Sequence, residues 1–167
     1  SLVGVNTNDK VSSGGALFGI GVRVLPNGGY IISSPNWGAN DEGAVTWCDA
    51  TGCVGNISAA NSLLGTNLSD QVGDILISTF SDGNYAVLSS LWGLNDQGAV
   101  TLGAGFTGTF GPLTSSNSII GVAASGGAYL DYSYYEPYCR LTVLRPSDLT
   151  ISFMTAPMCL DQKVFAP

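Results

Sequence analysis

Short apolar runs separated by Gly, Asn, Asp and Ser dominate the first two thirds of the chain. Runs of this length between turn residues are typical of antiparallel β-strands. The pattern first predicts strands over residues 16–25, 30–34, 43–48 and 53–57. It then predicts a second set over residues 75–80, 85–89, 98–102 and 108–113. No segment shows the apolar period of a helix, so the chain is predicted to be all-β.

The pattern changes after Gly121, where Tyr-rich and alternating segments replace the regular runs. Three further strands are predicted, over residues 128–135, 139–144 and 149–154. These strands do not repeat the earlier residues, and we interpret them as a degenerate third unit or a C-terminal cap.

An internal repeat organises the chain. Residues 27–47 recur at 82–102 with a constant offset of 55, and eleven of the 21 positions are identical. A Ser-x-x-Gly segment also recurs, at residues 1–4, 62–65 and 118–121, and is expected to be a linker that enters each unit. The predicted units are therefore 1–61, 62–117 and 118–167. Tandem four-stranded units of 50 to 60 residues have the size of a propeller blade.

The order of motifs resembles the FG-GAP repeat of integrin α-chain-type β-propellers. The resemblance rests on the following motifs: an Asp-Gln-Val-Gly segment at 70–73, an Asp-Gly-Asn-Tyr turn at 82–85, a Ser-Ser-Pro segment at 33–35 and the Gly-Ala-Val strands at 43–45 and 98–100. The Ser-Pro-Asn-Trp and Gly-Ala-Val-Thr-Trp motifs resemble repeats of very large bacterial haemagglutinin or adhesin-like surface proteins. The resemblance implies propeller-like units and a role in adhesion.

Calcium is expected to be absent, although the FG-GAP turn has a calcium-binding form. That form needs several carboxylate or amide oxygens, because Ca²⁺ takes six or more oxygen ligands. The first turn, residues 25–29, has no carboxylate, and the second, residues 80–84, has only Asp82. The ligand pattern is incomplete, and no other cofactor is indicated.

The charge of the chain excludes several classes of function. The net charge is −7, with only five Lys and Arg residues, which argues against nucleic acid and anionic membranes as partners. There is no His, which removes the commonest general base and transition-metal ligand. No apolar run is long enough to predict membrane insertion. We therefore expect no enzymatic activity.

The four cysteines predict disulfides and an oxidising compartment, so a secreted or cell-surface protein is expected. Cys48 and Cys53 flank a four-residue turn and can face each other across it. Cys139 and Cys159 would then pair and fix the tail. The cross-pairings stay open, because four cysteines allow three connectivities.

Aromatic residues in the loops between strands and in the Tyr-rich tail are the candidate binding residues: Trp37, Trp92, Tyr132, Tyr134 and Tyr135. Trp and Tyr combine apolar area with a polar tip, which suits a sugar or a protein partner. The alternative is structural: each Trp would close the contact between neighbouring units, and the Tyr residues would pack an amphipathic strand on the core.

Two full units and a degenerate third do not close a propeller, which leaves sheet edges and apolar faces uncovered at both ends. Self-association would cover them, as a closed ring or as an open filament. The leading hypothesis is a secreted or surface structural and adhesion protein that self-associates and binds partners such as a glycan or surface protein. The alternative is a carbohydrate-binding, lectin-like module.

Overall fold

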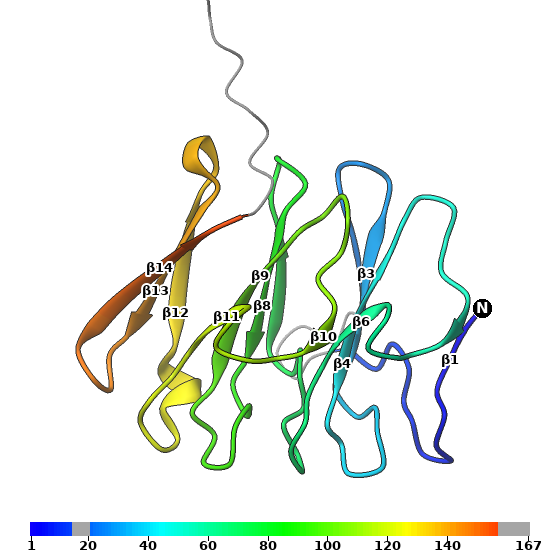
Figure 1. Cartoon of the computed structure of the whole chain (residues 1–167), viewed down its shortest axis with the longest axis horizontal. Coiled ribbons are helices and arrows are strands. Elements are labelled where there is room, and N and C mark those ends of the chain that lie inside the picture. Colours follow the sequence, from blue (N-terminus) through cyan, green and yellow to red (C-terminus); the bar gives the residue numbers. More distant parts are fainter. Residues whose placement is uncertain (15–20, 157–167) are drawn as a thin grey trace, which may run out of the picture.

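The computed structural model describes residues 1–14 and 21–156. Three β-sheets stand side by side along the long axis of the molecule, and the N-terminal end and the third sheet lie at opposite ends of this row (Figure 1). The described ranges contain no α-helix and two short 3₁₀ turns, Gly126–Tyr129 and Glu136–Tyr138. The predicted all-β chain of tandem antiparallel units is therefore confirmed.

The first two sheets repeat one strand order. Sheet 1 has the order β10-β6-β4-β3-β2, formed by β2 (Val22–Val24), β3 (Tyr30–Ser34), β4 (Ala44–Cys48), β6 (Ser62–Leu64) and β10 (Gly111–Pro112). Sheet 2 has the order β11-β9-β8-β7, formed by β7 (Leu76–Thr79), β8 (Tyr85–Ser89), β9 (Ala99–Gly103) and β11 (Ser118–Ile120).

The tail forms sheet 3, a meander in the order β12-β13-β14. Its strands are β12 (Asp131–Tyr135), β13 (Arg140–Arg145) and β14 (Thr150–Thr155). The three strands predicted after residue 121 are thus present, shifted by one to three residues. A separate two-stranded sheet, the β1–β5 pair, joins β1 (Leu2–Val3) to β5 (Gly55–Asn56) in parallel.

The Ser-x-x-Gly segments were expected to be linkers, and this expectation is wrong. Ser62–Leu64 pairs antiparallel with β4 and closes sheet 1, and Ser118–Ile120 closes sheet 2 against β9 in the same way. A buried hydroxyl pair holds each closing strand, Thr46 to Ser62 at 2.7 Å and Thr101 to Ser118 at 2.6 Å. The predicted unit boundaries after residues 61 and 117 therefore coincide with the start of a closing strand.

The fourth antiparallel strands predicted at 53–57 and 108–113 are also corrected. Only two residues of each are strand, and each pairs in parallel with the first strand of its own predicted unit: β5 with β1, and β10 with β6. Backbone hydrogen bonds from Ile57 N to Val3 O and from Leu113 N to Leu64 O continue this parallel path. Of the strand predicted at 16–25, residues 15–20 lie outside the described ranges.

Two apolar layers hold the row of sheets together. Successive side chains of a strand point to opposite faces of its sheet, so one strand can contact the sheets on both sides. The layer between sheets 1 and 2 includes Ile31, Val45, Leu63, Tyr85 and Val87. The layer between sheets 2 and 3 includes Leu88, Val100, Leu102, Leu141 and Val143. Sheet 2 is thus buried on both faces.

A repeated aspartate fixes each connection from one sheet to the next. Asp70 accepts backbone N–H bonds from Thr66 and Asn67, both at 2.8 Å, and from Gly93 at 2.9 Å. Asp9 makes the same set of bonds one unit earlier, including one from Gly38 at 2.9 Å. Each carboxylate therefore ties the segment after a closing strand to the Trp-Gly turn of the next sheet.

Candidate functional site

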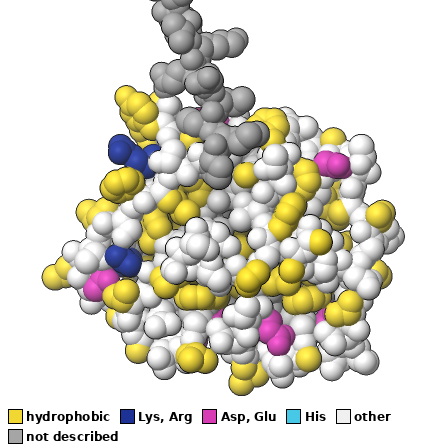
Figure 2. Space-filling model, viewed as in Figure 1, with side chains coloured by type: hydrophobic (Ala, Val, Ile, Leu, Met, Phe, Trp, Pro, Cys, Tyr) yellow, Lys and Arg dark blue, Asp and Glu magenta, His cyan; other side chains and the backbone are white. Residues whose placement is uncertain are grey.

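The outer face of sheet 3 is the candidate interaction surface. Leu144, Ile151 and Phe153 lie on it and are 40%, 67% and 69% exposed. The opposite face of the same strands carries Leu141 and Val143, which are fully buried against sheet 2. Figure 2 shows hydrophobic and cationic side chains together at the end of the molecule that sheet 3 forms. An apolar sheet face is usually buried, and its exposure indicates a contact surface.

Sheet 2 shows what covers this face in the preceding unit. Val143 pairs with Ser152 as Val87 pairs with Thr101, and both valines face the preceding sheet. This register makes Leu144, Ile151 and Phe153 the counterparts of Leu88, Val100 and Leu102, respectively. The sheet 2 residues are buried, at 9%, 0% and 4% exposure, under sheet 3. The exposed face therefore has the composition of a face that a following sheet covers.

A cation and two tyrosines border this apolar face. The Arg140 guanidinium lies 5.8 Å from the centre of the Phe153 ring. Tyr135 and Tyr138 contact each other with ring centres 5.4 Å apart, and they are 53% and 60% exposed. Arg and Tyr beside an apolar centre are typical of protein interfaces.

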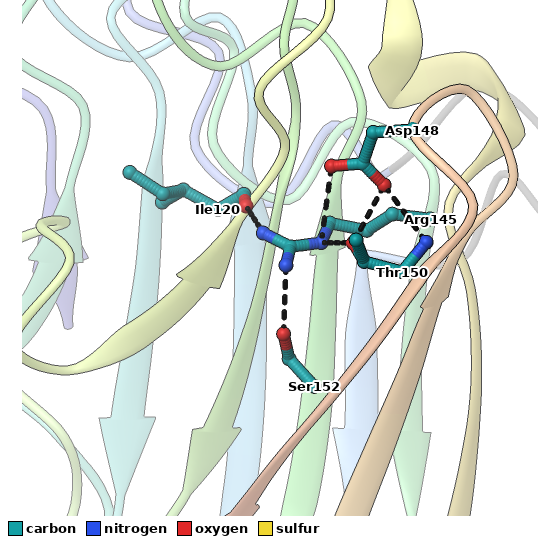
Figure 3. A network of polar contacts seen from close by, with 5 residues as sticks. All are labelled: Ile120, Arg145, Asp148, Thr150 and Ser152. Carbon is teal, nitrogen blue, oxygen red and sulfur yellow. Dashed lines mark hydrogen bonds and ion pairs between the residues drawn. The ribbon is translucent and has the colours of Figure 1, made fainter.

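Arg145 holds β14 in place beneath this face (Figure 3). Its guanidinium donates to Ile120 O at 2.9 Å, to Ser152 Oγ at 2.8 Å and to Thr150 Oγ1 at 2.9 Å. Asp148 lies 3.7 Å from Arg145 Nε, and a hydrogen bond from the Thr150 hydroxyl lowers the pKa of this carboxyl, with the Arg145 charge contributing. One side chain thus fixes sheet 3 to β11 of sheet 2.

The opposite end of the row exposes a second group of apolar side chains. Val3, Val22, Val24 and Val54 are 48%, 40%, 70% and 77% exposed. They belong to β1, to β2 and to the residue before β5. Both ends of the sheet stack therefore present apolar side chains to solvent.

Trp37 and Trp92 occupy equivalent turns but different surroundings. Trp92 packs against the layer between sheets 1 and 2. Trp37 lines a cavity of about 370 Å³ together with Val5, Glu42 and Leu64. Both indole Nε1 atoms are buried and have no hydrogen-bond partner within the described ranges. Since both repeats share this unpaired N–H, it is a property of the repeated turn rather than evidence for a ligand at one of them.

The predicted tyrosine cluster is divided between two faces. Tyr132 donates to Ser78 Oγ at 2.7 Å, and Tyr134 donates to Asp82 and stacks on Phe80 with ring centres 4.0 Å apart. Burial raises the pKa of both hydroxyls, and Asp82 raises that of Tyr134 further. Tyr132 and Tyr134 therefore bind sheet 3 to sheet 2, and Tyr135 alone of the three points outward.

The cysteines agree with the prediction as far as the described residues reach. Cys48 and Cys53 form a disulfide across the turn after β4. The predicted pairing of Cys139 with Cys159 involves a residue outside the described ranges. No group of three or more His, Cys, Asp and Glu side chains that could hold a metal occurs in residues 1–14 and 21–156.

None of the helices in the described part of the chain is long and apolar enough to cross a membrane.

Two polar residues that organise the stack were missed by the sequence reasoning. Asp74 is buried and accepts from Ser90 N at 2.8 Å and from Ser90 Oγ at 2.5 Å. Burial raises its pKa, although both hydrogen bonds oppose the rise. Asp70 enters the sequence-based prediction only as the first residue of the Asp-Gln-Val-Gly segment at 70–73. The recurrence of Asp three residues after an Asn, at Asn6 and Asp9 and again at Asn67 and Asp70, is the signal that could have found the carboxylate clamp.

Comparison with known proteins identifies the repeat. A family described as a repeat of unknown function (DUF5650) matches residues 24–74 and 79–128, in two consecutive copies. No curated protein and no solved structure matches the chain. The two matches include the central strands of sheets 1 and 2 and exclude the strands of sheet 3.

Proposed function

The chain belongs to the DUF5650 repeat family, and we propose that it is a structural protein whose copies associate head to tail through the two ends of the sheet stack. The observation that carries this proposal is the exposed outer face of sheet 3, whose counterparts in sheet 2 are buried. A second copy that packs on this apolar face would bury it through the same kind of side-chain contacts that join sheets 1, 2 and 3.

The two ends of the stack differ, which determines the kind of assembly. One end carries Leu144, Ile151 and Phe153, and the other carries Val22 and Val24. Contact between two different surfaces is heterologous, so it produces a ring if the rotation closes and a filament if it does not. The propeller-like arrangement expected from the FG-GAP resemblance corresponds to the ring.

Secretion or display on a cell surface is part of this proposal. The Cys48–Cys53 disulfide supports it, because disulfides persist in oxidising compartments. The adhesin-like role rests on the resemblance of the repeats to those of large bacterial surface proteins. A net charge of −7 leaves nucleic acid an unfavourable partner.

The native mass tests self-association directly. Size-exclusion chromatography with light scattering, run over a hundredfold range of concentration, should give species larger than the 17.1 kDa chain that grow with concentration or reach one defined multiple. A monomer at every concentration would contradict the proposal.

The cavity beside Trp37 supports a second candidate, a carbohydrate-binding module. Trp37, Glu42 and Thr66 bring an aromatic surface and polar groups to one hollow, which is the composition of many sugar sites. Binding on a glycan array that the Trp37→Ala substitution abolishes, with an unchanged circular dichroism spectrum, would support it. The Trp92→Ala variant serves as a control, and absence of binding to every glycan would contradict this candidate.

A further inference from the structure

The β1–β5 pair is the counterpart of the β6–β10 pair one unit later. Leu2 and Val3 pair in parallel with Gly55 and Asn56, as Leu63 and Leu64 pair with Gly111 and Pro112. Both strands begin with a Ser-x-x-Gly segment and are followed by the Asp that clamps the next sheet. Strand β1 therefore shares with the closing strand β6 its sequence motif, its parallel partner and the clamping Asp that follows it.

The two pairs differ on their other edge. Strand β6 is also paired antiparallel with β4, so the β6–β10 pair extends sheet 1 to five strands. The corresponding edge of β1 has no strand partner within residues 1–14 and 21–156. An unpaired strand edge presents free backbone N–H and C=O groups, which favour addition of another strand.

Within the described residues, sheet 3 is missing the complementary strand. Its strand β14 is the counterpart of β4 and β9, which carry the closing strands β6 and β11 on their outer edges. In the described part of the chain the outer edge of β14 carries no closing strand, and sheet 3 ends there with three strands. Among residues 1–14 and 21–156, sheet 3 therefore has no counterpart of the closing strand that β1 resembles.

We infer that the β1–β5 pair of one copy adds to β14 of a second copy and completes its sheet 3. The resulting order, β12-β13-β14-β1-β5, repeats the order β2-β3-β4-β6-β10 of sheet 1. Applying the register of β6 on β4 places Ser1 opposite Ser152, Leu2 opposite Ile151 and Val3 opposite Thr150. The partner is a second copy rather than the same chain, because the N-terminal end and β14 lie at opposite ends of the molecule (Figure 1).

The side chains at this register fit the repeated chemistry. In sheets 1 and 2 the first position joins two buried hydroxyls, Thr46 with Ser62 and Thr101 with Ser118. Ser1 and Ser152 would provide the same pair. The Ser152 hydroxyl already accepts from Arg145, and it keeps its own proton to donate to the incoming serine.

The connection after β1 then brings the next sheet over the exposed face. Asp9 clamps the segment after β1 to Gly38 of sheet 1, as Asp70 clamps the segment after β6 to Gly93 of sheet 2. Because sheet 2 follows β6 onto the face of sheet 1, sheet 1 of the incoming copy would follow β1 onto Leu144, Ile151 and Phe153. Strand addition and burial of the apolar face are one event in this arrangement.

This inference rests on the proposed self-association, and cysteine pairs test the two separately. Leu2→Cys and Ile151→Cys are prepared as two full-length variants, mixed, and oxidised mildly. Residues directly opposite on antiparallel strands have Cα atoms within disulfide range. We expect a disulfide-linked dimer on a non-reducing gel from the mixture, and none from either variant alone. Leu149→Cys, which is 92% exposed and precedes β14, replaces Ile151→Cys in the control mixture and should give no dimer.

Light scattering on the same mixtures, before oxidation, separates the possible failures. Assembly above the monomer mass without a dimer from the Leu2 and Ile151 pair would overturn strand addition and leave the proposed self-association standing. A monomer at all concentrations would overturn both. Equal dimer yields from the control mixture would also overturn the inference, since random collision and not register would then form the bond.

Discussion

Tyr85 packs directly over Gly103, its cross-strand partner in sheet 2. The equivalent pair in sheet 1 is Tyr30 and Cys48, and there Cys48 is linked to Cys53 by a disulfide across the following turn. Tyr85 is 2% exposed, whereas Tyr30 is only partly buried. The two repeats therefore stabilise the same position differently, one by a covalent link and one by a buried ring.

Gly103→Ala tests the packing of Tyr85. A Cβ at this position would lie 2.1 Å from two atoms of the Tyr85 ring, so the ring must move. We expect the free energy of unfolding to fall by about 1–3 kcal/mol, the range typical of overpacking a core. Urea unfolding followed by tryptophan fluorescence measures it. In the control, Gly126→Ala, the nearest atom is the Ser147 hydroxyl at 3.1 Å, and the loss should be smaller. Equal losses would contradict this account.

Asp70→Ala tests the clamp between sheets 1 and 2. The substitution leaves the backbone N–H groups of Thr66, Asn67 and Gly93 without their acceptor. Because Asp70 is fully buried, we expect a loss of about 2–4 kcal/mol in the free energy of unfolding, at roughly 1 kcal/mol for each group. Asp9→Ala removes the same set of bonds at a partly exposed position, where water can replace the acceptor. We therefore expect Asp9→Ala to lower the free energy of unfolding less than Asp70→Ala does. A larger loss for Asp9→Ala would contradict the view that burial strengthens the Asp70 hydrogen bonds.

Asp74 gives stability a pH dependence of defined sign. Burial raises its pKa in the folded chain above the ordinary value of 3.8, so the folded state binds this proton more tightly than the unfolded state. The associated stability is present below pH 3.8 and is lost as the pH rises through the raised pKa. Asp74→Asn should remove this pH-dependent loss of stability. The measurement is the slope of the unfolding free energy against pH, which should become less negative above pH 3.8 in the variant.

Asp148→Asn is the matched control for that slope. The pKa of Asp148 is lowered, chiefly by the hydrogen bond from Thr150, so its contribution to stability is present above pH 3.8 and is lost as the pH falls through the lowered pKa. The two substitutions should change the slope in opposite directions. Changes of the same sign would contradict the assigned environments.

The sequence predicts the central strands well and the connections poorly. Tyr30–Ser34 and Tyr85–Ser89 match their predicted ranges because a repeated turn and a repeated apolar run define both ends. Ser62–Leu64 was missed as a strand because three residues are too short to show alternation. The pattern over residues 108–113 predicts a longer antiparallel strand, but only Gly111–Pro112 is strand, because its parallel pairing with β6 depends on a distant segment.

The faces of the third sheet could not be assigned from the sequence. Alternation places Tyr132 and Tyr134 on one face and Tyr135 on the other, but tyrosine suits both a core and a surface. Hydrogen bonds to Ser78 and Asp82, 54 and 52 residues away along the chain, decide that Tyr132 and Tyr134 face sheet 2. Such distant partners carry no local pattern.

The native mass of the Phe153→Glu variant tests the central claim, that the outer face of sheet 3 joins copies of the chain. Phe153 is 69% exposed, so the monomer should fold, while a carboxylate at the centre of an apolar contact should prevent assembly. Leu68→Glu, at a site 75% exposed in the connection between β6 and β7, is the control. Light scattering should find Phe153→Glu at 17.1 kDa and both the wild type and Leu68→Glu at larger masses. Assembly of Phe153→Glu as complete as that of the wild type would contradict the claim.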